Sequence, residues 1–340
     1  MEGTIHMNKK AVTRRDVAEA AGVSETIVSY VINNTRYVAP EKRKRVLDAI
    51  HTLNYRPNSV ARALRGKGSN MILFIAGDLS NEYYGSLVRE IGSVASNAGF
   101  LVSLMDDQSA PQLINTISTY QVDAVVISSA AMDMDSIRKL ADAGLPIVLL
   151  MTRDYPDFPG KVSRIYTGIE SGIMRAVRLL YEKGRRHLVH VDRVSKNGHF
   201  ATRRDMRFRG FCNEMEACGL PLLDSSFISG CTTYDEVYDA VCQRIQSGEP
   251  IDGFVCRNDP LACTVLSAIR ACGLEVPRDI SVTGFDNSRM SRVIQPKLTT
   301  LAHNQTDMAA AIFQSIKEML AGEKPQDRYL QTTLIERETT

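Results

Sequence analysis

The sequence predicts an α/β protein in which a small helical headpiece precedes a larger body of two parallel α/β sheets. Its 340 residues are enough for two or three domains. Residues 7–68 carry 13 Lys and Arg against 5 Asp and Glu, whereas residues 69–340 carry 28 against 33. The hydrophobic pattern changes at the same place, from helical spacing to strands that alternate with helices. The basic headpiece indicates a polyanionic partner, although a solvated basic tail would have the same charge.

Three short helices are predicted in the headpiece. The first spans residues 13–21 and is followed by a tight connection, residues 22–24, whose serine caps a second helix at residues 25–32. The third spans residues 40–53 and begins at a proline, with Ala39 in place of a capping side chain. The apolar side chains expected to form a shared core are Val17, Ala18, Ala21, Ile27, Val28, Val31, Val46, Leu47, Ile50 and Leu53. Two short helices joined in this way form a helix-turn-helix, whose second helix enters the major groove of DNA.

The polar side of this pattern is equally ordered. The outward face of the second helix consists of Glu25, Thr26, Ser29 and Tyr30. A basic run at residues 42–45 is interpreted as a solvated face of the third helix. Residues 55–66 then carry three arginines and continue into a flexible Gly-Lys-Gly linker.

From residue 71 onward, short apolar strands alternate with amphipathic helices. The predicted strands form two series, 71–76, 100–105, 124–127 and 147–151, then 187–191, 253–256 and 280–284. Strands that alternate with helices of this length form parallel sheets with right-handed crossovers, so two series predict two lobes. Ligands of such sheets bind beyond the carboxyl ends of the strands.

Several classes of protein are disfavoured by the same sequence. The longest apolar runs are far shorter than the roughly 20 residues of a membrane helix, and the polar N-terminus lacks the apolar core of a secretory signal, so a cytoplasmic protein is expected. The seven cysteines all follow residue 211 without a Cys-x-x-Cys pair, which predicts reduced thiols and no metal site. The sequence has no phosphate-binding Gly-rich loop, nucleophile elbow or metalloprotease motif, so neither an enzyme nor a cofactor is expected.

Characteristic motifs run through residues 12–81 and recur along the body. They are residues 16–18, 21–24, 28–29, 31–34, 55–58 and 78–81, followed by 207–211, 254–262, 273–286, 296–300 and 334–338. On these motifs nearly the entire chain resembles the LacI/GalR family, the lactose-repressor and galactose-repressor family of bacterial transcription regulators. The resemblance implies a headpiece at 7–56, a hinge helix and linker at 57–70, and a bilobed domain at 71–340 that is like the periplasmic sugar-binding proteins.

The resemblance also implies how the chain is shared between the two lobes. The first lobe is expected at about 71–166 and 301–326, and the second at about 167–300 and 327–340. The chain would cross between the lobes three times, and residues 304–322 would return to the first lobe.

The resemblance further implies which residues contact DNA. They are Thr13, Ser24, Glu25, Thr26, Ser29, Tyr30, Asn33, Arg36, Tyr55, Asn58, Ala61 and Leu64. Leu64 would enter a minor-groove base step from the hinge helix, the alternative being a core residue of a linker helix. The family frequently has threonine at the position of Ile27 and arginine at that of Tyr30, so the operator sequence does not carry over, because tyrosine cannot bind guanine as arginine does.

Effector-binding residues are implied at strand ends of the body. They are Asn81, Tyr83, Tyr84, Arg153, Arg207, Asn258, Asp259 and Asp286. All but Asn81 have an alternative structural role: an ion pair for the arginines, a turn or helix cap for Asn258, Asp259 and Asp286, and hinge-side core for the tyrosines. Many sugar-binding members have an aspartate in the stretch that is residues 151–153 here, and the family commonly has Val-Asp-Asn where this chain has residues 165–170. The loss of these carboxylates, together with Arg153 and Arg207, leads to the hypothesis of an anionic or unusual effector.

Together these implications predict a repressor that acts as a homodimer, rather than a tetramer, on near-palindromic double-stranded operator DNA. A small-molecule effector, a sugar or sugar derivative, would bind between the lobes and change operator affinity. The alternative from another class is a solute-binding protein without regulatory DNA binding, which predicts no salt-dependent DNA affinity.

Overall fold

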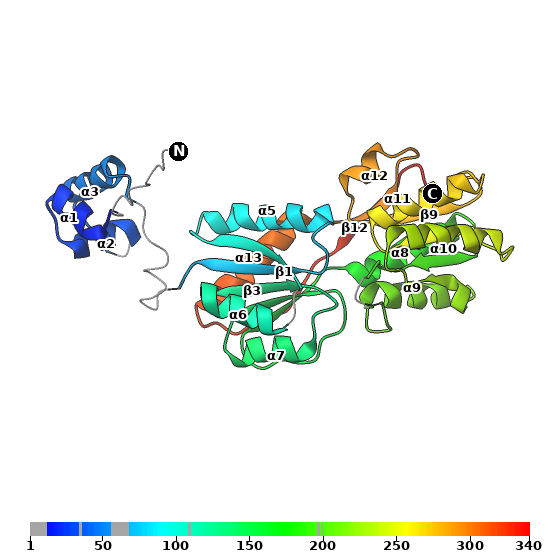
Figure 1. Ribbon diagram of the computed structural model, residues 1–340, viewed down its shortest axis with the longest axis horizontal. Coiled ribbons are helices and arrows are strands. Elements are labelled where there is room, and N and C mark those ends of the chain that lie inside the picture. Colours follow the sequence, from blue (N-terminus) through cyan, green and yellow to red (C-terminus); the bar gives the residue numbers. More distant parts are fainter. Residues whose placement is uncertain (1–11, 34–35, 56–67, 108–109, 196–197, 199) are drawn as a thin grey trace, which may run out of the picture. The chain divides into compact units, whose positions relative to one another are not determined.

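The computed structural model describes residues 12–33, 36–55, 68–107, 110–195, 198 and 200–340. It forms two compact units, Met1–Ser69 and Asn70–Thr340. The first contains the headpiece and the second contains the body (Figure 1). Within the described residues, no helix is both long and apolar enough to cross a membrane.

The headpiece contains the three predicted helices, α1 Arg14–Ala21, α2 Glu25–Asn33 and α3 Pro40–Thr52. Gly22 ends α1 in the left-handed region, with φ of 61°, where glycine has no steric penalty. The proline stands at the first turn of α3, and Ala39 provides no side-chain cap. The helices therefore begin and end close to where capping and periodicity predicted.

The headpiece core differs from the prediction at two positions. Leu47 was expected inside but is 50% exposed, because the buried face of α3 follows the i, i+3, i+4 spacing of Val46, Ala49 and Ile50. Ile27 is half-buried and belongs neither to the core cluster nor to the partly buried side chains that pack against it. The members of that cluster are Val17, Ala18, Ala21, Val28, Val31, Val46, Ala49 and Tyr55.

The first lobe of the body is built on a six-stranded parallel sheet in the order β11-β5-β4-β3-β1-β2. Its strands are β1 Met71–Ala76, β2 Leu101–Asp106, β3 Ala124–Ser128, β4 Ile147–Met151, β5 Val162–Tyr166 and β11 Arg328–Tyr329. Its helices are α5 Glu82–Ser96, α6 Ala110–Tyr120, α7 Met134–Asp142 and α13 Gln305–Leu320. The central strands β3 and β4 are buried along their whole length, which is typical of a parallel sheet covered on both faces.

The second lobe has a six-stranded sheet in the order β12-β10-β9-β8-β6-β7. Its strands are β6 Leu188–Val191, β7 Phe227–Ile228, β8 Gly253–Cys256, β9 Ser281–Phe285, β10 Thr299–His303 and β12 Thr332–Ile335, of which β12 runs antiparallel to β10. Its helices are α8 Ile169–Glu182, α9 Met206–Ala217, α10 Tyr234–Gln246, α11 Asp259–Ala271 and α12 Arg289–Val293. A short 3-10 turn, η1 Asp224–Ser226, precedes β7.

The chain crosses between the sheets three times, after β5, after β10 and after β11. The last two crossings lie a few residues later than the expected boundaries at 300 and 326. They are displaced because β10 pairs with β9 in the second sheet, while β11 pairs with β5 in the first. All three crossings lie between strand ends, so the two lobes face each other across a hinge (Figure 1).

Candidate functional site

The exposed surface of α2 carries most of the predicted base-facing residues. Glu25 and Thr26 are exposed at its first turn, and Ser29 and Tyr30 are half-buried along the same helix. The guanidinium of Arg36 lies over the ring of Tyr30, with its central carbon 5.4 Å from the ring centroid. A cation and a phenol are therefore held together beside α2.

Three of the predicted DNA-contacting residues have structural roles in the headpiece. Thr13 caps α1: its hydroxyl accepts a hydrogen bond from the Asp16 amide at 3.3 Å, and its own amide donates to the Asp16 carboxylate at 2.7 Å. The Ser24 hydroxyl accepts a bond from the Ile27 amide at 3.4 Å, at the start of α2. Tyr55 is only 8% exposed and packs in the core, so its ring is not on the surface. Asn58, Ala61, Leu64 and the side chain of Asn33 lie outside the described residues.

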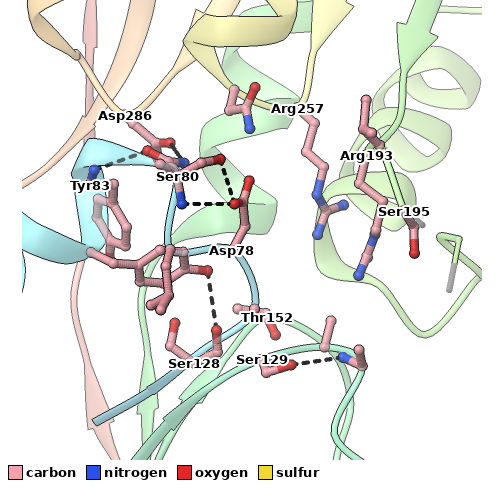
Figure 2. A pocket seen from close by; sticks show the side chains of 18 of the residues that line it. Asp78, Ser80, Tyr83, Ser128, Ser129, Thr152, Arg193, Ser195, Arg257 and Asp286 are labelled. Carbon is pink, nitrogen blue, oxygen red and sulfur yellow. Dashed lines mark hydrogen bonds between the residues drawn. The ribbon is translucent and has the colours of Figure 1, made fainter. Parts of the chain in front are cut away.

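A cleft of about 690 Å³ lies between the two lobes. Its polar lining comes largely from the carboxyl ends of parallel strands, which is where open α/β sheets bind ligands. These residues are Asp78 after β1, Ser129 after β3, Thr152 after β4, Arg193 after β6, Arg257 after β8 and Asp286 after β9 (Figure 2). The volume is within the range of small-molecule sites.

Asn81 joins the lobes at one wall of the cleft. Its side-chain oxygen caps α5 by accepting from the Tyr83 amide at 3.0 Å, and its amide nitrogen donates to the Asp286 carboxylate at 3.0 Å. Burial raises the pKa of Asp286, while the Arg207 guanidinium opposes that rise. Because the N-cap of α12 is Ser288, the carboxylate of Asp286 is not a helix cap.

The two neighbouring tyrosines both line the cleft. Tyr83 is 9% exposed and its hydroxyl contacts the sulfur of Met308 at 3.3 Å, so most of its ring belongs to the core. The Tyr84 hydroxyl donates to the Ser128 carbonyl at 3.2 Å. Their rings meet edge to face at 5.2 Å. A cleft position and a core position were alternatives for these tyrosines, and the structure shows that the pair occupies both.

The opposite wall holds an ion-pair network that the sequence analysis did not predict. Arg257 lies 3.0 Å from the Asp205 carboxylate and 3.5 Å from that of Asp192, and Arg193 pairs with both aspartates. Both aspartates are 3% exposed. Burial would raise the pKa of Asp205, but Arg257 and Arg193 outweigh burial and hold it well below its usual range. Figure 2 shows the two arginines of this wall.

Arg207 has no such partner. It is 9% exposed, lines the cleft and lies over the Phe285 ring, with its central guanidinium carbon 4.7 Å from the ring centroid. Its side chain forms no ion pair or hydrogen bond with any residue that the structure describes, and its buried Nε is unsatisfied. Burial lowers its pKa, and Arg257 lowers it further. The alternative role of a surface ion pair is thus contradicted.

Three other buried polar atoms of cleft-lining residues also have no hydrogen-bond partner among the residues that the structure describes. They are Thr152 Oγ1, Arg193 Nε and His303 Nδ1. Burial and the nearby charge of Arg207 lower the pKa of His303 to about 3, so its imidazole is neutral at pH 7. Because buried polar groups are normally satisfied, these atoms indicate a polar occupant of the cleft.

Two residues expected in the cleft are not among its lining residues. Arg153 turns away to donate to the Met132 carbonyl and lies over the Tyr155 ring at 5.1 Å. Asp259 is fully buried behind the wall and accepts hydrogen bonds from the Ser288 amide at 2.6 Å and the Thr300 hydroxyl at 2.5 Å.

Asn258 does line the cleft, and its side chain also caps α11 by accepting from the Leu261 amide at 3.0 Å. The helix cap and the cleft position that the sequence left as alternatives are therefore compatible. Arg257 precedes Asn258 directly, and both follow β8, so the strand-end rule that selected Asn258 applied equally to Arg257.

A helix-turn-helix headpiece joined to a bilobed body with a polar cleft defines the class of ligand-responsive bacterial DNA-binding regulators. Residues 13–58 match the family described as bacterial regulatory proteins, lacI family, and residues 177–340 match the periplasmic binding protein-like domain. The chain is 31% identical over 303 residues to the HTH-type transcriptional regulator DegA of Bacillus subtilis (strain 168), covering 87% of each chain. The chain therefore belongs to the lacI family of bacterial regulatory proteins, which are transcription regulators rather than enzymes.

Two further comparisons agree with this assignment. The HTH-type transcriptional repressor PurR of Histophilus somni (strain 129Pt) is 30% identical over 299 residues, which cover 86% of this chain and 88% of that protein. Among solved structures, the lac repressor dimer bound to operator and the anti-inducer ONPF superposes with a TM-score of 0.80 at 24% identity, covering 97% of this chain and 99% of that chain. That likeness confirms the predicted fold.

Proposed function

We propose that this regulator represses transcription as a homodimer on a near-palindromic operator, and that a small molecule in the cleft changes its operator affinity. The observation that carries the proposal is the unpaired Arg207 in a cleft between lobes that meet directly through Asn81 and Asp286. The name of PurR, a repressor related over most of both chains, supports repression.

On the DNA side, α2 supplies the base contacts. Glu25 and Thr26 are exposed at its first turn, the part of a recognition helix that faces base edges. Ser29, Tyr30 and Arg36 follow along the same surface, where Arg36 contacts the phosphate backbone. The structural roles of Thr13, Ser24 and Tyr55 make them positioning residues that hold the helices in register.

The hinge residues Asn58, Ala61 and Leu64 complete the proposal. Leu64 enters a minor-groove base step, and the unstacking costs about a few kcal/mol, which the added contacts of bent DNA offset. Any change in the distance between the two hinges of a dimer then alters operator affinity.

On the effector side, the lobes are linked by bonds that a ligand can replace. The Asn81 amide donates across the cleft to Asp286, and Glu82, the next residue, accepts from the Arg289 amide at the start of α12. A ligand hydroxyl that takes the place of Asn81 at Asp286 weakens the link and rotates one lobe against the other. The coupling between ligand and DNA is reciprocal by thermodynamic necessity.

Selection of bound sequences from a random duplex pool tests the DNA half of this proposal. The intact chain is expected to recover a near-palindrome, and Leu64→Ala to recover the same sequence with weaker binding, because it removes the wedge and leaves the recognition helix intact. Affinity should fall steeply with salt as phosphate contacts are screened. Recovery of no preferred sequence, with or without added sugars and purines, would contradict the proposal and favour a solute-binding protein.

A further inference from the structure

We propose that the cleft ligand is a monocarboxylate that also carries hydroxyl groups, such as a sugar acid, and that Arg207 binds its carboxylate. The inference rests on the proposed function for the regulatory consequence, but the binding itself can be tested without DNA. It concerns the chemical class of the effector, which the headpiece does not determine.

Arg207 is a buried cation without an ion-pair partner among the described residues. The side chain is 91% removed from solvent, yet its guanidinium forms no ion pair or hydrogen bond among the described residues. A buried cation without an anion is unfavourable, so proteins normally pair such a group or use it to bind a ligand. One face of the guanidinium is covered by the Phe285 ring, which leaves its edge for a partner. That planar edge matches the two oxygens of a carboxylate.

The ion pairing of the cleft arginines helps to distinguish a ligand with one negative charge from a ligand with two. Arg193 and Arg257 are matched by Asp192 and Asp205 in the same wall. Arg207 is the third arginine among the described residues that line the cleft, and although the nearby Asp286 carboxylate favours its charged form by raising its pKa, no carboxylate of the described residues forms an ion pair with it. A guanidinium without an ion-pair partner suits a carboxylate better than a phosphate ester, which carries a second charge near neutral pH.

The first-lobe side of the cleft strengthens this distinction. It presents carboxylates at Asp78, Asp106 and Asp107. Asp78 accepts hydrogen bonds from the amide and the hydroxyl of Ser80, at 2.9 and 2.6 Å. These aspartates repel a dianion about twice as strongly as a monoanion, and they accept hydrogen bonds from hydroxyl groups.

Several buried polar atoms of other cleft-lining residues are also unsatisfied among the described residues. Thr152 Oγ1 and His303 Nδ1 are buried, line the cleft and find no hydrogen-bond partner within the described part of the chain. Arg193 Nε is a further unsatisfied donor on the opposite wall. Donors and acceptors distributed over both lobes require a ligand with several polar groups rather than a bare anion. The cleft volume of about 690 Å³ accommodates a molecule of monosaccharide size.

The experiment measures binding of matched ligands to the full-length protein by titration calorimetry. The carboxylates are D-gluconate, D-glucuronate and D-galacturonate, the uncharged counterparts are D-glucose and D-galactose, and D-glucose 6-phosphate carries the dianion. We expect at least one carboxylate to bind and its uncharged and phosphorylated counterparts to bind at least tenfold more weakly. The inference is overturned if no carboxylate binds, or if an uncharged sugar or the phosphate ester binds as tightly.

Variants then assign the carboxylate to Arg207. Arg207→Gln should weaken carboxylate binding at least tenfold, and Arg207→Lys should retain part of it because the charge remains. Arg278→Gln is the matched control, since Arg278 is an exposed arginine of the same lobe that pairs with Glu275 and Asp279. Unchanged binding in Arg207→Gln would refute the assignment.

Two measurements keep these outcomes interpretable. The thermal midpoint of ligand-free Arg207→Gln should stay close to that of the intact chain, because among the described residues the Arg207 side chain forms no ion pair or hydrogen bond that the substitution would break. An uncharged ligand that changes operator affinity would overturn this inference and leave the proposed function standing. A carboxylate that binds through Arg207 without altering operator affinity would support this inference and contradict the proposed regulatory function.

Discussion

Asp259 is expected to make the stability of the protein depend on pH near neutrality. Burial, followed by the neighbouring charge of Asp286, raises the pKa of Asp259 from 3.8 to about 7. A carboxyl group whose folded pKa is raised binds its proton more tightly in the folded state, so its stabilising contribution is complete at low pH and is lost as pH rises toward 7. The substitution Asp259→Asn tests this prediction, because an amide does not titrate and the pH dependence due to Asp259 is removed.

The magnitude follows from the two pKa values. A shift of three units corresponds to about 4 kcal/mol between the fully protonated and fully ionised limits. At about pH 5 the group retains about 2.7 kcal/mol of this contribution, and at about pH 8 almost none. Urea unfolding followed by circular dichroism, at both pH values, gives the free energy of unfolding of the intact chain and of Asp259→Asn.

The predicted result is a change with pH in the difference between the two proteins. The intact chain should lose between about 2 and 3 kcal/mol relative to Asp259→Asn from about pH 5 to about pH 8. Any constant cost of the amide, which cannot accept both bonds from Ser288 and Thr300, cancels in this comparison. Asp239→Asn removes an exposed carboxylate of α10 and serves as the control for net charge. A difference that does not vary with pH would refute the reasoning.

Three further predictions concern the cleft wall, a close contact behind it and the headpiece. Arg257→Met should lower the free energy of unfolding by about 3 kcal/mol, because it leaves buried carboxylates without a matching cation; an unchanged urea midpoint would contradict this. Gly284→Ala should destabilise the folded protein by about 1–3 kcal/mol, because a Cβ there would clash with Asp259 Oδ1. A thermal midpoint equal to that of the intact chain would argue against such crowding. Thr13→Ala should cost about 1 kcal/mol through loss of the α1 cap, weakening binding to all operators by a similar factor; a change in base preference would instead show direct readout by Thr13.

Most of the fold could be predicted because its signals are local. The starts of α1 and α3 follow from Thr13 and Pro40, and the strands β1 and β4 are short apolar runs of the length expected for a covered parallel sheet. The lobe boundaries were less accurate because β10 and β11 belong to a sheet through pairing partners that are distant in sequence. Leu47 was misplaced because apolar character alone does not say which side of a helix meets the core.

Cleft-lining residues could be predicted only where a polar residue follows the carboxyl end of a strand. Asn258 and Asp286 were found in this way, and Arg257 was accessible to the same rule. The pairing of Arg257 with Asp205 was not, because it joins the end of β8 to the residue before α9 and exists only in the folded lobe.

Residues that do not line the cleft show the limit of the same reasoning. Arg153 follows β4 as expected, but its long side chain turns to the Met132 carbonyl instead of the cleft. Asp259 sits one residue beyond Asn258, and the first turn of α11 carries it behind the wall. The direction of a side chain at a loop or helix start depends on neighbours that strand-end logic does not contain.

We propose that a ligand bound at Arg207 changes the affinity of the protein for operator DNA. The most direct test is fluorescence anisotropy of the selected operator, titrated with the intact chain and with Arg207→Gln, in the absence and presence of the tightest-binding carboxylate. We expect the ligand to change the operator Kd of the intact chain and to have no such effect on Arg207→Gln. Operator DNA should in turn change the affinity of the intact chain for the ligand by the same factor. An operator Kd that is identical with and without every ligand that occupies the cleft would contradict this proposal.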